Sequence, residues 1–168
     1  MYYWRVTKYN PIYRDAQGRY TREEWTSIED IGKLYKGEEL TVEEYEVIEN
    51  AYVEAVVFAM KQLELETLKV TELETGEYTV YKGVSDLTSE HFYKTVQNNK
   101  DVSIDDVPHL VKLILREIIW AKLVSDDLCV HFGYDYYMYF IIKKKLEKVI
   151  RHISEKGLFI EDFKSPYL

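Results

Sequence analysis

The residues best suited to chemistry are concentrated between His131 and Tyr139, in the sequence HFGYDYYMY. A histidine near an aspartate can act as a general base, but only when the two lie within hydrogen-bonding reach. In one unbroken strand, His131 and Asp135 share a face but lie about 13 Å apart at ~3.3 Å per residue. In a hairpin with a turn at 133–135, His131 faces Tyr137 instead. We therefore interpret His131 as a strand histidine bonded to a neighbour and Asp135 as a turn residue.

Both arrangements of this segment stay open at the level of sequence. The even positions from Leu128 to Phe140 are all apolar or aromatic, which predicts a buried face. A strand of that length exceeds the usual three to ten residues, so the hairpin is favoured, with Phe132 opposite Tyr136. A glycine at the first position of such a turn is unusual, which keeps a long or bulged strand as the alternative.

The rest of the sequence carries no recognisable catalytic or metal-binding pattern. His91, His109 and His152 fall on three separate predicted helices, with no pair at the spacing that metal sites use. The single cysteine, Cys129, lies in a predicted strand, where a buried thiol is usually inert. No glycine-rich phosphate loop or serine nucleophile motif is present. We expect no metal and no cofactor.

Composition narrows the classes of partner. The chain of 168 residues has a net charge of -8, which opposes binding to nucleic acid because affinity for phosphates depends on lysine and arginine. It has no apolar run long enough to cross a bilayer and no apparent leader, so we expect no membrane partner and a cytoplasmic location. The chain holds 16 tyrosines, a residue enriched at protein-recognition surfaces, although tyrosine also fills strands and cores.

A cluster of acidic residues surrounds the start of the longest predicted helix. It comprises Glu38, Glu39, Glu43, Glu44, Glu46, Glu49 and Glu54. Carboxylates at a helix N-terminus are favoured by the helix dipole, so a solvated face is the simpler interpretation. With Tyr45 and Tyr52 among them, the same residues could also form a docking surface for a basic partner.

A second candidate surface is the aromatic loop near the N-terminus, where Trp25 could equally pack beneath the sheet. This loop contains Tyr9, Tyr13, Arg14, Tyr20 and Trp25.

Hydrophobic periodicity and turn residues predict the elements that position these groups. Thr41 and Glu44 form a capping box before a helix at 42–63. The predicted strands are 2–9, 67–73, 77–82, 118–124, 128–132, 136–142 and 158–163. The other predicted helices are a short one after Ser27, one within 85–97, one capped by Asp105 or Asp106, and 143–156. This order predicts one α+β domain, residues 1–168, with an antiparallel or mixed sheet and helices mainly on one face.

Two functional hypotheses follow. The first is a non-catalytic protein-binding domain, such as an inhibitor, an immunity-type protein or an adaptor, that meets a basic partner through an acidic, tyrosine-rich surface. The second is a small enzyme or ligand-binding domain with a pocket near residues 131–139. The candidate binding residues are Tyr45, Glu49, Tyr52, His131, Asp135, Tyr137 and Tyr139.

Overall fold

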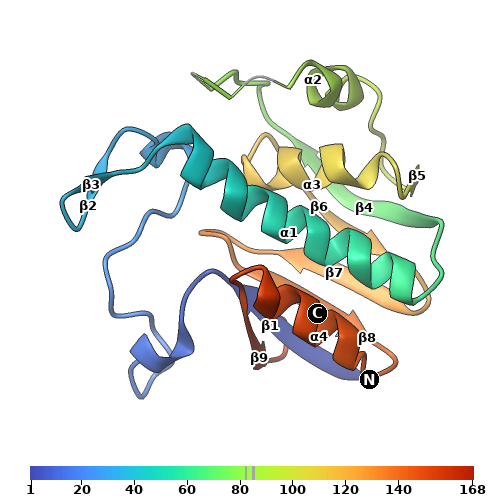
Figure 1. Cartoon of the computed structure of the whole chain (residues 1–168). Helices are drawn as coiled ribbons and strands as arrows, with labels where there is room; N and C mark the ends of the chain where they lie inside the picture. The colour runs from blue at the N-terminus through green and yellow to red at the C-terminus, as the bar shows by residue number, and fades with distance from the viewer. Residues whose placement is uncertain (82, 85) are drawn as a thin grey trace.

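The computed structural model describes residues 1–81, 83–84 and 86–168, and its main feature is a seven-stranded sheet (Figure 1). The strands lie in the order β5-β4-β6-β7-β8-β1-β9, and all neighbours are antiparallel. Their bounds are β1 Tyr2–Thr7, β4 Thr67–Thr75, β5 Asp101–Ser103, β6 Ile119–Val124, β7 Leu128–Phe132, β8 Met138–Ile142 and β9 Phe159–Asp162. The predicted α+β class is confirmed.

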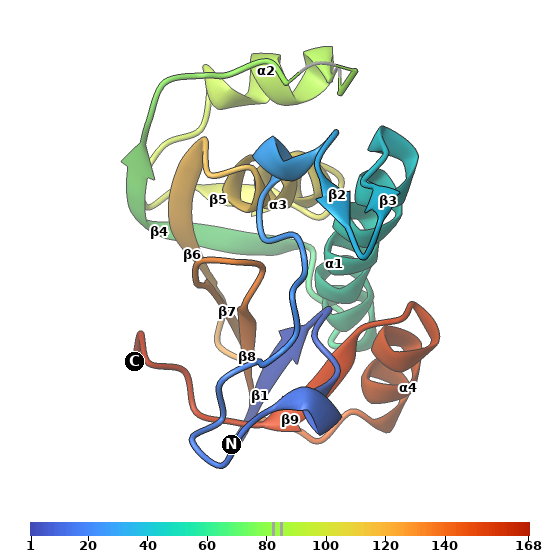
Figure 2. The same cartoon turned by 90° about the vertical axis from the view of Figure 1, so that its left-hand side faces the viewer.

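Helices α1 (Val42–Gln62), α3 (Val107–Leu115) and α4 (Glu147–Glu155) cover one face of the sheet, as predicted (Figures 1 and 2). A fourth helix, α2 (Leu87–Tyr93), packs against α3. Figure 2 shows the C-terminal tail, residues 163–168, on the side of the sheet opposite α1 and α4. The helices therefore cover one face of the sheet, and the C-terminal tail runs along the other.

The segment between β1 and α1 carries only short elements. They are the 3-10 turns η1 (Pro11–Tyr13) and η2 (Ile28–Asp30) and a two-stranded ribbon of β2 (Leu34–Tyr35) and β3 (Glu38–Glu39). The short helix predicted after Ser27 is thus a single 3-10 turn, which Ser27 caps. The ribbon stands beside the start of α1 and is not bonded into the large sheet (Figure 2).

The first turn of α1 has the predicted capping box. Thr41 Oγ1 accepts a hydrogen bond from the Glu44 backbone N–H at 3.2 Å, and the Glu44 carboxylate accepts one from the Thr41 N–H at 3.1 Å. Behind this cap, the apolar stripe of α1 faces the sheet and contributes to one continuous hydrophobic cluster. Within the described residues, no helix combines the length and apolar character that a bilayer crossing requires.

The predicted hairpin of strands 67–73 and 77–82 is wrong. Strand β4 continues to Thr75, and its partners are β5 and β6 instead of the following residues. Residues 77–80 form no strand, and residue 82 lies outside the described residues. The strand β5 was not predicted, and α4 begins four residues later than expected.

The segment from β7 to β8 is a hairpin with a five-residue loop, residues 133–137. Phe132 pairs with Met138 and His131 pairs with Tyr139, so the predicted alternation of faces is right but the predicted partners are wrong by two residues. The long-strand alternative is also wrong. Asp135 and Tyr136 both adopt left-handed backbone angles, with φ values of 57° and 64°, which lengthens the turn.

Candidate functional site

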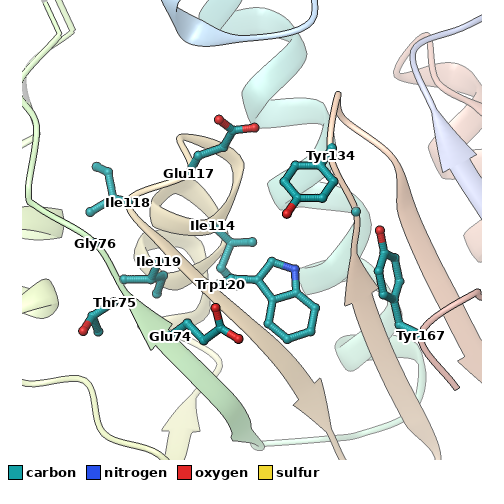
Figure 3. A pocket seen from close by; sticks show the side chains of 11 residues that line it. Glu74, Thr75, Gly76, Ile114, Glu117, Ile118, Ile119, Trp120, Tyr134 and Tyr167 are labelled. Carbon is teal, nitrogen blue, oxygen red and sulfur yellow. The ribbon is translucent and has the colours of Figure 1, made fainter.

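A cavity of about 500 Å³ lies on the sheet face opposite α1, where four segments meet (Figure 3). They are the end of β4, the junction of α3 with β6, the loop 133–137, and the C-terminal tail. We call this cavity the aromatic pocket. Its principal lining residues are Glu74, Glu117, Ile118, Trp120, Tyr134 and Tyr167.

Trp120 forms the central wall of the aromatic pocket. It occupies an outward position of β6, between Ile119 and Ala121, which point into the core. Its indole Nε1–H donates to the backbone oxygen of Phe132 at 2.8 Å, and this bond fixes the ring orientation. Glu74 lies directly opposite Trp120 on the neighbouring strand β4, so its carboxylate stands beside the indole (Figure 3).

Tyr167 supplies a second wall from the C-terminal tail. Its ring meets Trp120 edge-to-face, with centroids 6.0 Å apart. The tail is anchored by Ser165, whose hydroxyl lies 2.8 Å from His131 Nδ1 and accepts the Tyr167 backbone N–H at 3.2 Å. A Cβ atom at Gly133 would lie 2.9 Å from the Tyr167 hydroxyl, so a larger residue there would displace this ring.

Tyr134 forms the third, outer wall and is 78% exposed. The loop that carries it is held from below: the Tyr52 hydroxyl donates to the backbone oxygen of Tyr136 at 2.6 Å, and the Tyr9 hydroxyl donates to that of Asp135 at 2.7 Å. An exposed ring on an anchored backbone is available to a ligand.

Glu117 adds a second carboxylate at the point where α3 ends. Its φ of 57° is left-handed, and Ile118 N–H bonds back to the Leu113 carbonyl at 3.0 Å, the geometry that usually ends a helix on glycine. Burial, together with the nearby charges of Asp135 and Glu29, raises the pKa of Glu117. Among the residues that the structure describes, no lysine or arginine nitrogen lies within 4.0 Å of this carboxylate, so its charge is available to a ligand.

The chemistry of the aromatic pocket follows from this set of side chains. Three aromatic rings and two carboxylates line it, and none of its described lining residues is a lysine, arginine or histidine. Aromatic faces and carboxylates both attract cations. The described lining residues also include no cysteine and no serine.

Three of the predicted binding residues lie in the core, so the prediction that they contact a partner is wrong. Tyr45 and Tyr52 are 0% exposed and Glu49 is 1% exposed. Glu49 accepts two hydrogen bonds from Arg116, at 2.6 and 2.8 Å, and one from the Tyr45 hydroxyl. These three side chains bond to one another inside the protein. The pairing matters because a buried charge without a partner would lower the free energy of unfolding.

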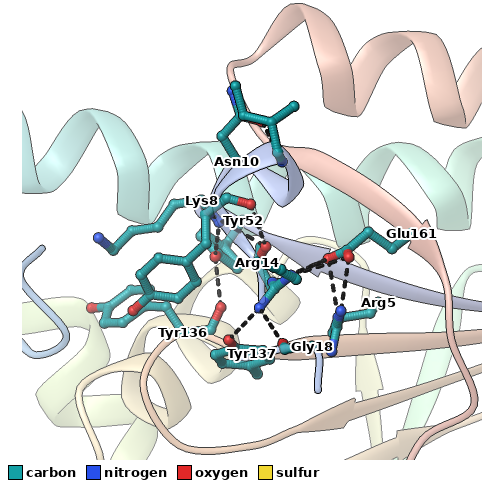
Figure 4. Close-up of polar contacts among 12 residues, drawn as sticks. Arg5, Lys8, Asn10, Arg14, Gly18, Tyr52, Tyr136, Tyr137 and Glu161 are labelled. Atoms are coloured by element: carbon teal, nitrogen blue, oxygen red, sulfur yellow. Dashed lines mark hydrogen bonds and ion pairs between the residues drawn. The ribbon is translucent and has the colours of Figure 1, made fainter. Parts of the chain in front are cut away.

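Tyr137 and Tyr139 also serve mainly internal contacts. Tyr137 accepts a hydrogen bond from Arg14, at 2.9 Å, and Arg14 shares the carboxylate of Glu161 with Arg5 (Figure 4). Tyr139 is 6% exposed beneath Tyr167. Both residues therefore support the sheet face next to the aromatic pocket without lining it.

The aromatic loop near the N-terminus packs inward in part, although Tyr13 is exposed. Tyr9 is buried against Tyr20 and Tyr137. Trp25 packs on Tyr45 of α1 and on Tyr136 of the loop 133–137. Only part of Trp25 faces solvent.

His131 is a strand histidine with hydrogen-bonding neighbours, and Asp135 is an exposed turn residue, as interpreted from the sequence. Cys129 Sγ lies 3.1 Å from His131 Nε2. Burial raises the pKa of Cys129 to about 11, and burial with the nearby Lys122 lowers the pKa of His131 to about 4. The pair is thus a neutral thiol and a neutral imidazole, not an activated nucleophile.

A second cluster resembles a catalytic triad in composition only. Ser89 Oγ lies 3.2 Å from His109 Nδ1, and Asp86 lies 3.9 Å from that same nitrogen. In a working triad the acid and the serine contact opposite nitrogens of the imidazole. Ser89 is also 0% exposed, and Asp86 caps α2. This cluster is structural.

Sequence reasoning found the loop that carries Tyr134 but missed the other walls of the aromatic pocket. Trp120 had a signal, because it is an aromatic residue at an outward position of a predicted hairpin. Glu117 and Tyr167 had none, since only the fold brings them together. Comparison of the chain with protein-family models, with curated proteins and with solved structures gave no match.

Proposed function

We propose that this protein is a non-catalytic binding domain that recognises a basic protein partner and holds one cationic side chain of that partner in the aromatic pocket. The observation that carries the proposal is the lining itself: Trp120, Tyr134 and Tyr167 with Glu74 and Glu117, and no basic residue among the described lining. The proposal keeps the partner class expected from the acidic, tyrosine-rich composition and moves the site from α1 to the opposite face of the sheet. A cytoplasmic location, which the single cysteine favours, belongs to the same proposal.

A lysine or arginine side chain fits this lining in two ways. Its alkyl part would lie against the aromatic rings and Ile118, and its charge would lie over the ring faces near the carboxylates. One such cation–ring contact contributes about 0.5–2 kcal/mol, depending on how much water is displaced. Net negative charge of the whole chain would also speed the approach of a basic partner.

The experiment is a titration of the 15N-labelled protein, followed through the indole N–H signals of its three tryptophans. The probes are capped lysine, capped arginine and capped trimethyllysine, with capped norleucine as the uncharged counterpart of lysine. Trp120 lines the aromatic pocket, whereas Trp4 is 2% exposed and serves as an internal reference. We expect the charged probes to shift the Trp120 signal and norleucine to leave it unchanged.

Matched variants locate the binding. Tyr134→Ala removes one wall and should weaken binding by about 2- to 30-fold, the equivalent of one cation–ring contact. Tyr2→Ala is the control, because Tyr2 is 41% exposed and lies on β1 outside the pocket. Equal binding of norleucine and lysine, or equal loss in both variants, would refute the proposal.

A second candidate function is a domain that binds a free small organic cation. The volume of about 500 Å³ favours it, because it lies within the range of roughly 300–1,000 Å³ of small-molecule sites. Choline separates the two candidates: tighter binding of choline than of capped lysine or arginine would favour the small ligand.

A further inference from the structure

A second concave surface lies on another part of the molecule, between the β2–β3 ribbon and the first turns of α1. This cavity of about 400 Å³ is lined mainly by Trp25, Leu40 and Val47 on its floor and by Glu38, Glu39 and Glu44 at its rim. We call it the acidic groove. It shares no lining residue with the aromatic pocket.

The ribbon that forms one wall is shaped by its turn. Lys36 and Gly37 both have positive φ values, of 53° and 83°, which is the backbone of a tight two-residue hairpin. Leu40 N–H bonds to the Lys33 carbonyl and Gly32 N–H to the Leu40 carbonyl, each at 2.9 Å. These bonds extend the pairing of the ribbon up to Leu40, the residue before the N-cap of α1.

The floor of the acidic groove is apolar and rigid. Val47 is 65% exposed on α1, an unusual exposure for a branched apolar side chain. Trp25 is held from behind, where the Lys8 ammonium lies 4.1 Å from its ring centroid and Tyr136 packs on it at 5.1 Å. The exposed side chain of Val47 and the fixed ring of Trp25 together form an apolar surface that suits an apolar side chain of a partner.

The rim is negative, and its charge is not neutralised by the described part of the chain. Residues 1–81, 83–84 and 86–168 place no lysine or arginine within 4.0 Å of the carboxylates of Glu38, Glu39 or Glu44. Glu43 and Glu46 on α1 extend the same charge. An acidic rim around an apolar floor repels acidic partners and attracts segments that combine apolar and basic residues.

We propose that the acidic groove binds an amphipathic segment of a basic protein partner, with apolar side chains on the floor and lysine or arginine side chains at the rim. This inference goes beyond the aromatic pocket and does not depend on it. In this proposal the acidic residues within 38–46 contact the partner. Tyr45 and Tyr52 do not, because both are buried.

The test uses a synthetic peptide of about 14 residues, four helical turns, with leucine on one face and lysine on the other. The full chain, 15N-labelled, is titrated with this peptide and with a counterpart that carries glutamate in place of lysine. We expect the lysine peptide to shift the Trp25 indole signal, to leave Trp4 unchanged, and to bind at least about tenfold more tightly than the glutamate peptide.

Variants on the surface distinguish the groove from general attraction to a negative protein. Val47→Asp and the pair Glu38→Lys with Glu39→Lys should each weaken peptide binding by about tenfold. Ile12→Asp is the control for the first, because Ile12 is 73% exposed elsewhere. The pair Glu64→Lys with Glu66→Lys controls for net charge.

The outcomes are separable. Equal losses from both charge-reversed pairs, or an unmoved Trp25 signal, would overturn the inference. Self-association of the chain that Val47→Asp abolishes would also overturn it, since a second copy would then be the occupant. Binding of capped trimethyllysine should be retained in the Val47→Asp protein, so a failure of the aromatic pocket and a failure of the groove give different results.

Discussion

Replacing Glu117 by glycine should stabilise the protein and weaken binding in the aromatic pocket at the same time. Glu117 ends α3 with a φ of 57°, where a residue with a Cβ is disfavoured by roughly 1–2 kcal/mol. Glycine relieves that cost but loses about 0.5–1 kcal/mol through its greater freedom in the unfolded chain. The expected net gain in the free energy of unfolding is about 0.5–1 kcal/mol.

The charge of Glu117 adds to this gain at neutral pH. Burial and the repulsion of Asp135 and Glu29 raise its pKa in the folded state, so folding favours the protonated form. Its favourable contribution is present below the unfolded pKa near 4.5 and is lost as pH rises through the folded pKa. The gain from Glu117→Gly should therefore be larger at pH 7 than at pH 4.

Binding should change in the opposite direction. One carboxylate about 5 Å from a cation in a partly hydrated site contributes about 1 kcal/mol, so Glu117→Gly should weaken binding of capped trimethyllysine about fivefold. Urea unfolding followed by circular dichroism gives the stability, and the Trp120 titration gives the affinity.

The chain offers a matched control in Glu64. Glu64 also has a φ of 57° and also follows a helix, with the Leu65 N–H bonding back to the Met60 carbonyl at 2.9 Å. Glu64→Gly should therefore stabilise the protein by a similar amount and leave binding unchanged. A loss of stability in Glu117→Gly, or undiminished binding in that variant, would refute the argument that this carboxylate is retained for a ligand.

Three further predictions concern the neighbouring structure. Gly133→Ala should displace the Tyr167 ring, because the added Cβ would lie 2.9 Å from its hydroxyl. We expect the variant to lose cation binding in the Trp120 titration and to show little change in the midpoint of urea unfolding. The rate of Cys129 alkylation by iodoacetamide should still be rising at pH 10, since burial raises its pKa to about 11; a plateau by pH 9 would contradict this. Arg116→Met should cost about 3–5 kcal/mol of unfolding free energy by leaving Glu49 buried without its partner, and a second change, Glu49→Leu, should restore most of that loss rather than add to it.

Local signals predicted the local elements of this fold. The capping box of Thr41 and Glu44 located the start of α1, and two apolar runs on either side of a polar turn located β6 and β7. The sheet order was not accessible in this way, because β4 pairs with β6 across the whole of α2, β5 and α3. A hairpin between neighbouring runs was the simpler expectation, and it was wrong because β4 pairs with β5 and β6, which come later in the chain.

The position of the tyrosines was the main error about the site. The acidic residues around Tyr45 and Tyr52, and the enrichment of tyrosine at recognition surfaces, suggested that both rings are exposed. The fold supplies them with internal partners, Glu49 for Tyr45 and the Tyr136 carbonyl for Tyr52, which a sequence cannot reveal. Burying a tyrosine hydroxyl costs little free energy when the hydroxyl has a hydrogen-bond partner. The burial of Tyr45 and Tyr52 is therefore compatible with their polar groups.

The loop 133–137 carries one tyrosine in the core and one at the surface, a difference that the sequence did not reveal. Tyr136 points into the core in a left-handed conformation, and two residues earlier Tyr134 points into solvent at the mouth of the aromatic pocket. The buried hydroxyls of Tyr9 and Tyr52 therefore determine where the Tyr134 ring lies relative to the pocket. Selection for ligand binding at the aromatic pocket would then also act on Tyr52, although no ligand can contact that residue. Substitutions in the core around Tyr52 would in turn change the affinity of the pocket for its ligand.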